Sequence, residues 1–312
     1  MKKTIIFMGF LLLVIACTSE EAGKKLELKN PFIGGTEGLK VSFQELRKDV
    51  FDGGRDPFDV TIKLDNAGES FVKKDDVRVK LSGINPSLFG KLEEQLTRSP
   101  DEDIAETRLD PAGNVLPSPL TTVDFAGLNH FTAITGASSI FPLRAEVCYL
   151  YGTRAVSKLC VLSNILNPKE GAICAINEDK QVFNSGAPVQ VQSVRESARA
   201  KDKVGFSFEI RKVGKGQVYE KKSKCSKTDR KNENRVYVNV DSKIDGLTCT
   251  GLTSAGTKAE GFVTLFDSVK LITCTQPITT KSDFEQVVTV SATYDYEDYV
   301  QTELTVKSSG EK

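Results

Sequence analysis

The chain contains no tryptophan, one histidine and two methionines among its 312 residues. Nucleophilic catalysis by a Ser–His or Cys–His pair would depend on that single histidine, His130, because an imidazole is the base in both pairs. The stretch around it, GLNHFTAI, carries no nucleophile motif such as G-x-S-x-G. We therefore interpret His130 as an ordinary strand or loop residue, and we assign no catalytic residue.

Ligands for metals are equally scarce. The sequence has no C-x-x-C pair and no second histidine, which removes the usual ligand sets for zinc. We expect no metal and no other cofactor. An excess of one charge is also missing, because 42 basic residues balance 42 acidic ones. This balance disfavours nucleic acid as a partner.

The first 16 residues have the composition of an export signal. Lys2 and Lys3 precede an apolar run over residues 5–16, which is too short to cross a bilayer as a helix. The run ends in VIAC, which resembles the lipobox of bacterial and archaeal lipoproteins. That resemblance implies cleavage before Cys17 and a lipid on its sulfur. A flexible tether would follow over residues 17–33. The alternative is an uncleaved anchor with an incidental cysteine.

Six of the seven cysteines remain once Cys17 carries a lipid. An even number in an exported chain predicts three disulfides. Four of the six can pair in three ways, and they are Cys174, Cys225, Cys249 and Cys274. The last two have similar flanks, LTCTG and LITCTQ, so we pair them with each other, and Cys174 then pairs with Cys225.

Two stretches set 145 residues apart share one pattern. Residues 143–161 read LRAEVCYLYGTRAVSKLCV and residues 288–306 read VTVSATYDYEDYVQTELTV. The two Tyr-x-Tyr sequences align, and strand alternation places all four tyrosines on a core face. We interpret each stretch as a β-hairpin, the first one turning at residues 152–155.

The hairpin interpretation also positions the last two cysteines. Cys148 and Cys160 would lie opposite each other on the outer face of the first hairpin. The second stretch has threonines at the matching positions, and Thr–Thr is a favoured cross-strand pair. We therefore predict a Cys148–Cys160 disulfide.

The other strand signals also come in two sets. Alternating apolar residues begin near residues 39, 58 and 77 in the first half of the chain, and near 189, 206 and 236 in the second. Short strands with turn signals between them and little helix are typical of immunoglobulin-like sandwiches. We predict an all-β chain of two tandem immunoglobulin-like β-sandwich domains, at residues 34–165 and 166–312.

Each half carries an insert, and the two inserts have opposite charge. Residues 91–110 hold seven acidic and three basic residues, and two short helices are expected here, at residues 86–96 and 100–108. Residues 211–235 hold ten basic and three acidic residues. The two inserts could meet within one molecule or between neighbours, which predicts salt-sensitive association.

The basic insert supplies a candidate interaction patch. Its members are Lys221, Lys222, Lys224, Lys227, Arg230 and Lys231. Runs of charge are most often solvated loops. The patch could instead hold anionic lipid headgroups or a surface polymer. It has few interleaved aromatic residues, so binding to single-stranded nucleic acid is disfavoured.

Residues 294–299, YDYEDY, place three acidic side chains beside aromatic ones. A calcium site or a sugar-stacking surface is conceivable for such a stretch. The alignment with the first Tyr-x-Tyr favours core tyrosines followed by a solvated acidic turn. A carboxylate pair for glycoside hydrolysis stays open, because any two acidic residues could form one.

The strand–Asn-x-Gly–strand pattern of residues 58–68 resembles CARDB-like and similar adhesion-type domains of prokaryotic surface proteins. The paired cysteines with Tyr-x-Tyr resemble uncharacterised secreted proteins of small-genome archaea. These resemblances imply a fold and a location and no catalytic residue. We expect a lipid-anchored protein on the extracellular face of the membrane, with a non-catalytic role in adhesion, partner binding or envelope structure. The alternative is an accessory of a carbohydrate-active or peptide-processing enzyme, with a site borne by loops. A ligand-delivery lipoprotein of a transporter is disfavoured, because such proteins usually show α/β patterning.

Overall fold

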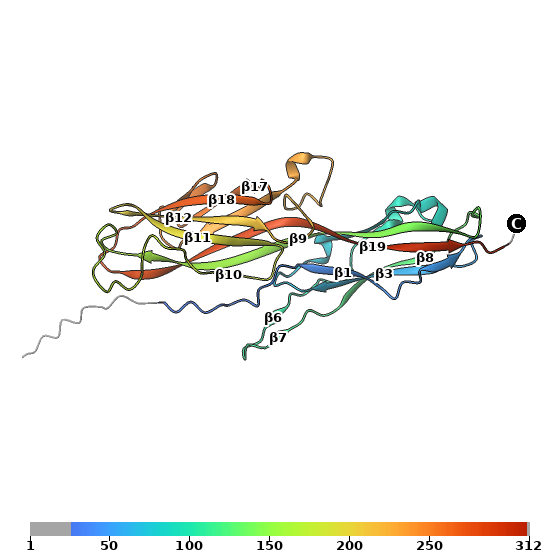
Figure 1. Ribbon diagram of the computed structural model, residues 1–312, viewed down its shortest axis with the longest axis horizontal. Coiled ribbons are helices and arrows are strands. Elements are labelled where there is room, and N and C mark those ends of the chain that lie inside the picture. The colour runs from blue at the N-terminus through green and yellow to red at the C-terminus, as the bar shows by residue number, and fades with distance from the viewer. Residues whose placement is uncertain (1–25, 311–312) are drawn as a thin grey trace, which may run out of the picture.

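The computed structural model describes residues 26–310, so the predicted signal peptide, Cys17 and most of the predicted tether lie outside the described residues. Within that range the chain is all β, as predicted, with nineteen strands and four short 3-10 helices. The strands form an elongated sandwich (Figure 1).

Two long strands run the length of the molecule. β9 (Ser138–Val161) and β19 (Phe284–Lys307) each contain 24 residues. They pair antiparallel without a break, from Ser138 opposite Lys307 to Val161 opposite Phe284. At ~3.3 Å per residue this two-stranded ribbon is about 80 Å long. It is the green and red pair that crosses the whole width of Figure 1.

The prediction of two hairpins is therefore wrong. Gly152 makes no turn and instead lies opposite Thr293 inside the ribbon. Period-two alternation is the same in a hairpin arm and in one long strand, and only turn residues separate the two cases. The repeat is real, but its two copies pair with each other. The offset of 145 relates Leu150 to Asp295, and these two residues are also Cα partners, so an approximate twofold axis passes between them.

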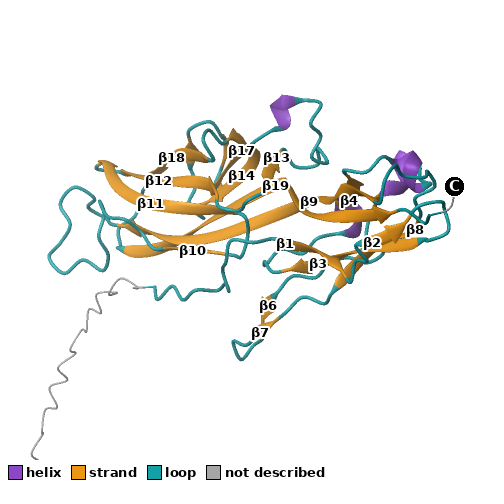
Figure 2. Cartoon of the chain, turned by 45° about the vertical axis from the view of Figure 1, so that its right-hand side comes forward, coloured by secondary structure: helices purple, strands orange, loops and turns teal. Residues whose placement is uncertain are grey.

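Around one end of the ribbon lies the first half of the sandwich. One sheet consists of β1 (Leu39–Gln44), β3 (Phe58–Asn66) and β8 (Thr121–Leu128). The facing sheet adds β4 (Val77–Ser82) and β5 (Thr97–Arg98) to β9, and β2 (Asp49–Phe51) in parallel to β19. A small hairpin of β6 (Arg108–Leu109) and β7 (Val115–Leu116) projects from this half (Figure 2).

Around the other end lies the second half. One sheet contains β11 (Val189–Ala200), β12 (Lys203–Lys212), β18 (Val269–Pro277) and β15 (Thr248–Cys249). The facing sheet adds β14 (Arg235–Asp241), β17 (Lys258–Thr264), β16 (Thr253–Ala255) and β13 (Gln217–Tyr219) to β19, and β10 (Val182–Asn184) to β9. Because β19 serves both halves, the predicted boundary at residue 165 divides the chain but not the sheet.

The 3-10 helices are η1 (Lys74–Asp76), η2 (Pro86–Phe89), η3 (Glu93–Leu96) and η4 (Arg230–Asn232). The helix predicted over residues 86–96 is thus two separate 3-10 turns. The helix predicted over residues 100–108 is wrong. Ile104 in that stretch is fully buried and exchanges two backbone hydrogen bonds with Val72, which holds the chain extended.

One apolar core runs through both halves, and four buried tyrosines lie where the halves meet. Tyr149 contacts Tyr151 and Tyr296, with ring centroids 5.5 and 5.8 Å away, and Tyr294 lies 6.4 Å from Tyr296. The predicted core position of these tyrosines is confirmed. The predicted acidic turn after them is wrong, because Glu297 and Asp298 are paired residues of the continuous strand β19, and Asp295 between the tyrosines has 3% exposure.

The tyrosine hydroxyls tie the outer strands to the ribbon in matching ways. The Tyr149 hydroxyl accepts a hydrogen bond from the amide of Leu39, the first residue of β1, at 3.0 Å. The Tyr294 hydroxyl accepts one from the amide of Val189, the first residue of β11, at 3.2 Å. Leu39 and Val189 are therefore equivalent positions, and β1 and β11 are equivalent strands.

Three disulfides are present, as predicted, and Cys249–Cys274 has the predicted pairing. The other two predicted pairings are wrong, because Cys148 bonds to Cys225 and Cys160 to Cys174. Cys148 and Cys160 lie on the same extended strand, where twelve residues span about 40 Å. That separation far exceeds the reach of a disulfide.

Candidate functional site

A cleft of about 610 Å³ lies over the centre of the ribbon, on the face opposite to the tyrosines. Its floor comes from the two long strands, one wall from the first half and the other from the loop after β13. The residues that line it are Asp75, Asp76, Val77, Arg78, Thr97, Arg98, Ser99, Cys148, Leu150, Lys222, Lys224 and Asp295. The approximate twofold axis between Leu150 and Asp295 therefore passes through the floor.

Asp295 holds the basic loop on this floor. Its carboxylate accepts hydrogen bonds from the amides of Lys222 at 2.9 Å and Lys224 at 2.6 Å, and from the hydroxyl of Ser223 at 3.4 Å. Lys222, Lys224 and Cys225 have positive φ angles of 66°, 55° and 52°. This backbone turns successive amides toward one point and makes a nest for an anion. Burial raises the pKa of Asp295, and the amide donors oppose that rise.

The Cys148–Cys225 disulfide fixes the same loop covalently. Cys148 lies on β9, and Cys225 ends the turn that surrounds Asp295, so the loop has two attachments side by side. In the first half, the positions equivalent to Asp295 and to Thr293 are Leu150 and Cys148. The cleft is therefore an asymmetric feature of a nearly symmetric frame.

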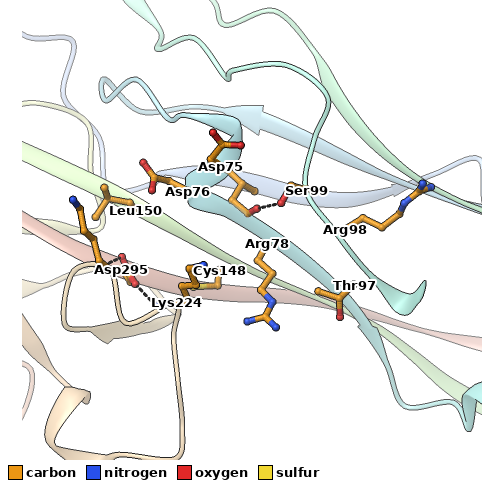
Figure 3. A pocket seen from close by; sticks show the side chains of 12 residues that line it. Asp75, Asp76, Arg78, Thr97, Arg98, Ser99, Cys148, Leu150, Lys224 and Asp295 are labelled. Carbon is orange, nitrogen blue, oxygen red and sulfur yellow. Dashed lines mark hydrogen bonds between the residues drawn. The ribbon is translucent and has the colours of Figure 1, made fainter. Parts of the chain in front are cut away.

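The walls of the cleft carry charges that are not neutralised. Within residues 26–310, Arg78, Lys222 and Lys224 have no carboxylate at ion-pair distance, and Asp75 and Asp76 have no cation there. Figure 3 shows Asp75 and Asp76 at one side of the cleft, apart from Lys224 at the other. A ligand that carries both charges would find a counter-charge on each wall.

The structure divides the predicted basic patch. Only Lys222 and Lys224 line the cleft. Lys221 stacks on Tyr237, with its Nζ 3.2 Å from the ring centroid, and burial lowers the pKa of this lysine. Lys227 pairs with Glu297 at 3.0 Å, and Arg230 and Lys231 lie apart on η4.

The two oppositely charged inserts face each other across the cleft without an ion pair between them in the described chain. The acidic insert contributes Thr97, Arg98 and Ser99 to one wall, and the basic insert contributes Lys222 and Lys224 to the other. In the first insert, Glu93 pairs instead with Lys80, at 2.8 Å. The ribbon, rather than these charges, joins the halves.

The donor atoms on the floor do not suit a metal ion. The sulfurs of Cys148 and Cys225 lie with a carboxylate oxygen of Asp295 within 4.8 Å of one another. Both sulfurs are consumed by their disulfide, and metal ligation needs thiolates. The carboxylate oxygens already accept the loop amides. The cleft can bind charge through its lysine, arginine and aspartate side chains.

His130 lies far from these residues in a different environment. It packs edge-on against Phe89, with ring centroids 5.1 Å apart, and it has 2% exposure. Burial lowers its pKa. These contacts agree with an ordinary packing role.

Sequence reasoning missed the acidic side of the cleft and Asp295. The available signal was a mismatch in the repeat: an acidic residue stands where the other copy has Leu150, close to a cysteine without a counterpart. Asp75, Asp76 and Arg78 carried no comparable signal, because their spacing is ordinary for the end of a turn and the start of an alternating strand.

A second groove, of about 560 Å³, lies on the tyrosine face where the halves meet. It runs beside the start of β1 and is bounded by Val41, Asp298 and Tyr299, among others.

No family model matches the chain, and none of the curated proteins matches it.

Proposed function

We propose that this protein is a lipid-anchored, non-catalytic binding protein on the extracellular face of the membrane. The observation that carries the proposal is the cleft. Unpaired cations and unpaired carboxylates face each other there on a frame fixed by a continuous ribbon and a disulfide. A preorganised, charged surface of this kind favours binding, because little ordering entropy remains to be lost.

The start of the described chain supports an orientation for the anchored molecule. Leu26 donates its amide to Glu285 at 2.6 Å, and its carbonyl accepts from Lys158 at 2.7 Å. Both partners lie at the outer end of the second half, where β9 ends and β19 begins. Leu26 follows Cys17 by nine positions in the sequence, which a chain can span over at most about 30 Å. A lipid on Cys17 would therefore place the second half near the membrane and the first half outward.

Part of the predicted tether is thus attached rather than free. The Phe32 ring lies 5.8 Å from the guanidinium of Arg154, and Ile33 and Gly34 donate their amides to Glu69. In the described part of the chain, no helix is long and apolar enough to cross a membrane.

The cleft is tested by binding to cells of the organism that makes the protein. The variant Lys222→Ala/Lys224→Ala should bind at least about tenfold less, because one displaced ion contact in a partly desolvated site is worth about 1–2 kcal/mol. The control Arg230→Ala/Lys231→Ala removes the same charge outside the cleft and should bind as the wild type does. Equal losses in both variants would mean that only net charge matters, and would contradict the proposal.

The anchor is tested by intact mass after expression in a host that processes lipoproteins, with and without reduction and alkylation. We expect a lipid adduct on Cys17 and six alkylatable thiols only after reduction. An unlipidated chain would overturn the proposed location and leave the cleft to be judged by the binding experiment.

A further inference from the structure

The first half of the sandwich lacks a strand that the second half has. In the second half β10 (Val182–Asn184) fills the side of the sandwich between β9 and β11. It pairs with Ala155–Ser157 of β9, and the Asn184 side chain bonds both backbone groups of Val191 on β11, at 2.8 and 2.9 Å. β10 thus covers the edge of β9 and the edge of β11 at the same time.

The equivalent edges of the first half are open. Residues 300–302 of β19 correspond to residues 155–157 of β9 through the offset of 145, and Val41 of β1 corresponds to Val191 of β11. Among the described residues, β1 pairs only with β3, and β19 has no partner on its outer side between β13 and β2. Within residues 26–310, no side chain bonds the backbone of Val41 as Asn184 bonds that of Val191.

Alternation along each strand shows which backbone groups face this gap. The amide of Leu39 points away from β3, toward Tyr149, so Val41 and Phe43 also point outward. On β19 the amide of Thr305 bonds to Lys48 of the outer edge, so Gln301 also faces outward. These are unused donors and acceptors on two strands that flank one space.

The side chains in the gap are only partly covered. Val191 and Ala155 of the filled half are each 1% exposed, whereas their counterparts Val41 and Val300 are half-buried. Phe43 is half-buried beside them. The apolar lining that β10 covers in one half thus stays accessible in the other.

The chain cannot fill this gap with its own equivalent segment. That segment is residues 32–34, which precede β1 as β10 precedes β11, and it is held elsewhere, by hydrogen bonds to Glu69 and by contact with Arg154 of β9. The first described residue, Leu26, is bound to Glu285 and Lys158 at the far end of the ~80 Å ribbon, and the sequence of residues 17–25 contains neither alternating apolar residues nor asparagine.

We propose that the open side of the first half is a strand-addition site for an extended segment of another protein. The segment runs antiparallel to β19, places an apolar side chain against Val41 and Val300, and presents an Asn two residues later to the backbone of Val41. Main-chain pairing supplies affinity and these two side chains supply selectivity. The site adds to the proposed binding function and does not use the cleft.

The probe is a fluorescent peptide with the sequence of residues 178–188, EDKQVFNSGAP, titrated into the whole disulfide-bonded protein in detergent. We expect saturable binding by anisotropy. A peptide with Ala at its Asn position should bind about tenfold more weakly, as should the protein variant Val41→Pro. This proline removes an outward amide and leaves the bonds between β1 and β3 intact.

The cleft variant Lys222→Ala/Lys224→Ala is the matched control and should bind the peptide with unchanged affinity. Should Val41→Pro not fold, hydrogen exchange of the wild type decides: the peptide must protect the amides of Val41, Phe43 and Gln301. Absence of binding, equal binding of a scrambled peptide, or protection elsewhere would overturn the site. A dimer that the peptide dissociates would show that a second copy, and not another protein, is the occupant.

Discussion

At the scale of residues, the buried tyrosines link the two layers of the sandwich. Their pKa values are raised because burial disfavours the phenolate, that of Tyr296 to about 12 and that of Tyr149 well above its ordinary value. Each hydroxyl therefore stays protonated and serves as a hydrogen-bond partner for the backbone of a facing segment.

Tyr149→Phe should lower the free energy of unfolding by about 1–3 kcal/mol, because the buried amide of Leu39 then loses its acceptor. Tyr299→Phe is the control, because Tyr299 is 55% exposed and should change stability by less than about 0.5 kcal/mol. Urea denaturation of both variants measures the difference. Equal effects would mean that the Tyr149 hydroxyl carries no special role.

Glu196 gives the stability a pH dependence. It is fully buried, and its carboxylate accepts from the amide of Cys160 at 2.9 Å and pairs with Lys180 at 3.1 Å. Burial raises its pKa from 4.5 to about 7. A raised pKa means that folding favours the protonated form. The contribution to stability is therefore full below pH 4.5 and is lost as the pH rises through about 7.

Relative to Glu196→Gln, the wild type should lose up to about 3 kcal/mol of unfolding free energy between pH 4 and pH 8. Denaturation curves of both proteins across this range provide the measurement. Parallel pH profiles would show that Lys180 and the amide of Cys160 offset the cost of burying the charge.

At the scale of elements, two contacts fix the loop after β13 to the ribbon. They are the hydrogen bonds to Asp295 and the Cys148–Cys225 disulfide, and neither was predicted from the sequence. Strand positions followed from alternation, and β1, β3, β4, β12 and β14 were predictable for that reason. The 24-residue strands were not, because Gly152 and Thr153 resemble turn residues and nothing local shows that the paired residues of the partner strand lie 123 residues away or more.

The same local ambiguity explains which disulfide pairings could be predicted from the sequence. Cys249 and Cys274 lie on neighbouring strands with matched flanking residues, so their pairing could be predicted from the sequence. Cys148 and Cys225 meet because Asp295 binds the amides of a loop that has three positive φ angles. The residues with positive φ are not glycines, so the sequence gives no sign of this turn. The acidic side of the cleft was not predicted either, because Asp75 and Asp76 lie outside both inserts and meet the basic loop only in space.

Asp295→Leu restores the residue of the equivalent position and should release the loop. We expect a loss of about 2–3 kcal/mol and faster hydrogen exchange at the amides of Lys222 and Lys224, which lose their acceptor. Asp298→Leu makes the same change three residues further along β19 and should leave this loop protected. Unchanged exchange in Asp295→Leu would assign the fixation to the disulfide alone.

At the scale of the whole molecule, the ribbon sets the angle between the halves. Its pairing is continuous through the centre, so bending would break main-chain hydrogen bonds. The oppositely charged inserts are therefore not needed to hold the halves together, and the prediction that they join neighbouring molecules is tested separately.

Association of neighbours through these inserts should be lost at high salt, because screening weakens contacts between exposed charges. Size-exclusion chromatography with light scattering at low and high salt measures it, and small-angle scattering should give the same elongated monomer under both conditions once association is removed. A monomer at every salt concentration would contradict contact between molecules. A shape that varies with salt would contradict the rigid ribbon.

The place of β19 at the end of the chain has a consequence for how the molecule is made. Its final residues, Tyr299–Lys307, complete the sheet of the half that is synthesised first, opposite residues 138–146 of β9. The N-terminal half therefore waits for β19, and its apolar surface stays uncovered until that strand has been made. Contacts this distant in sequence form slowly and leave edges open to aggregation. A protein of this design depends on protection during its synthesis more than a string of separate domains would.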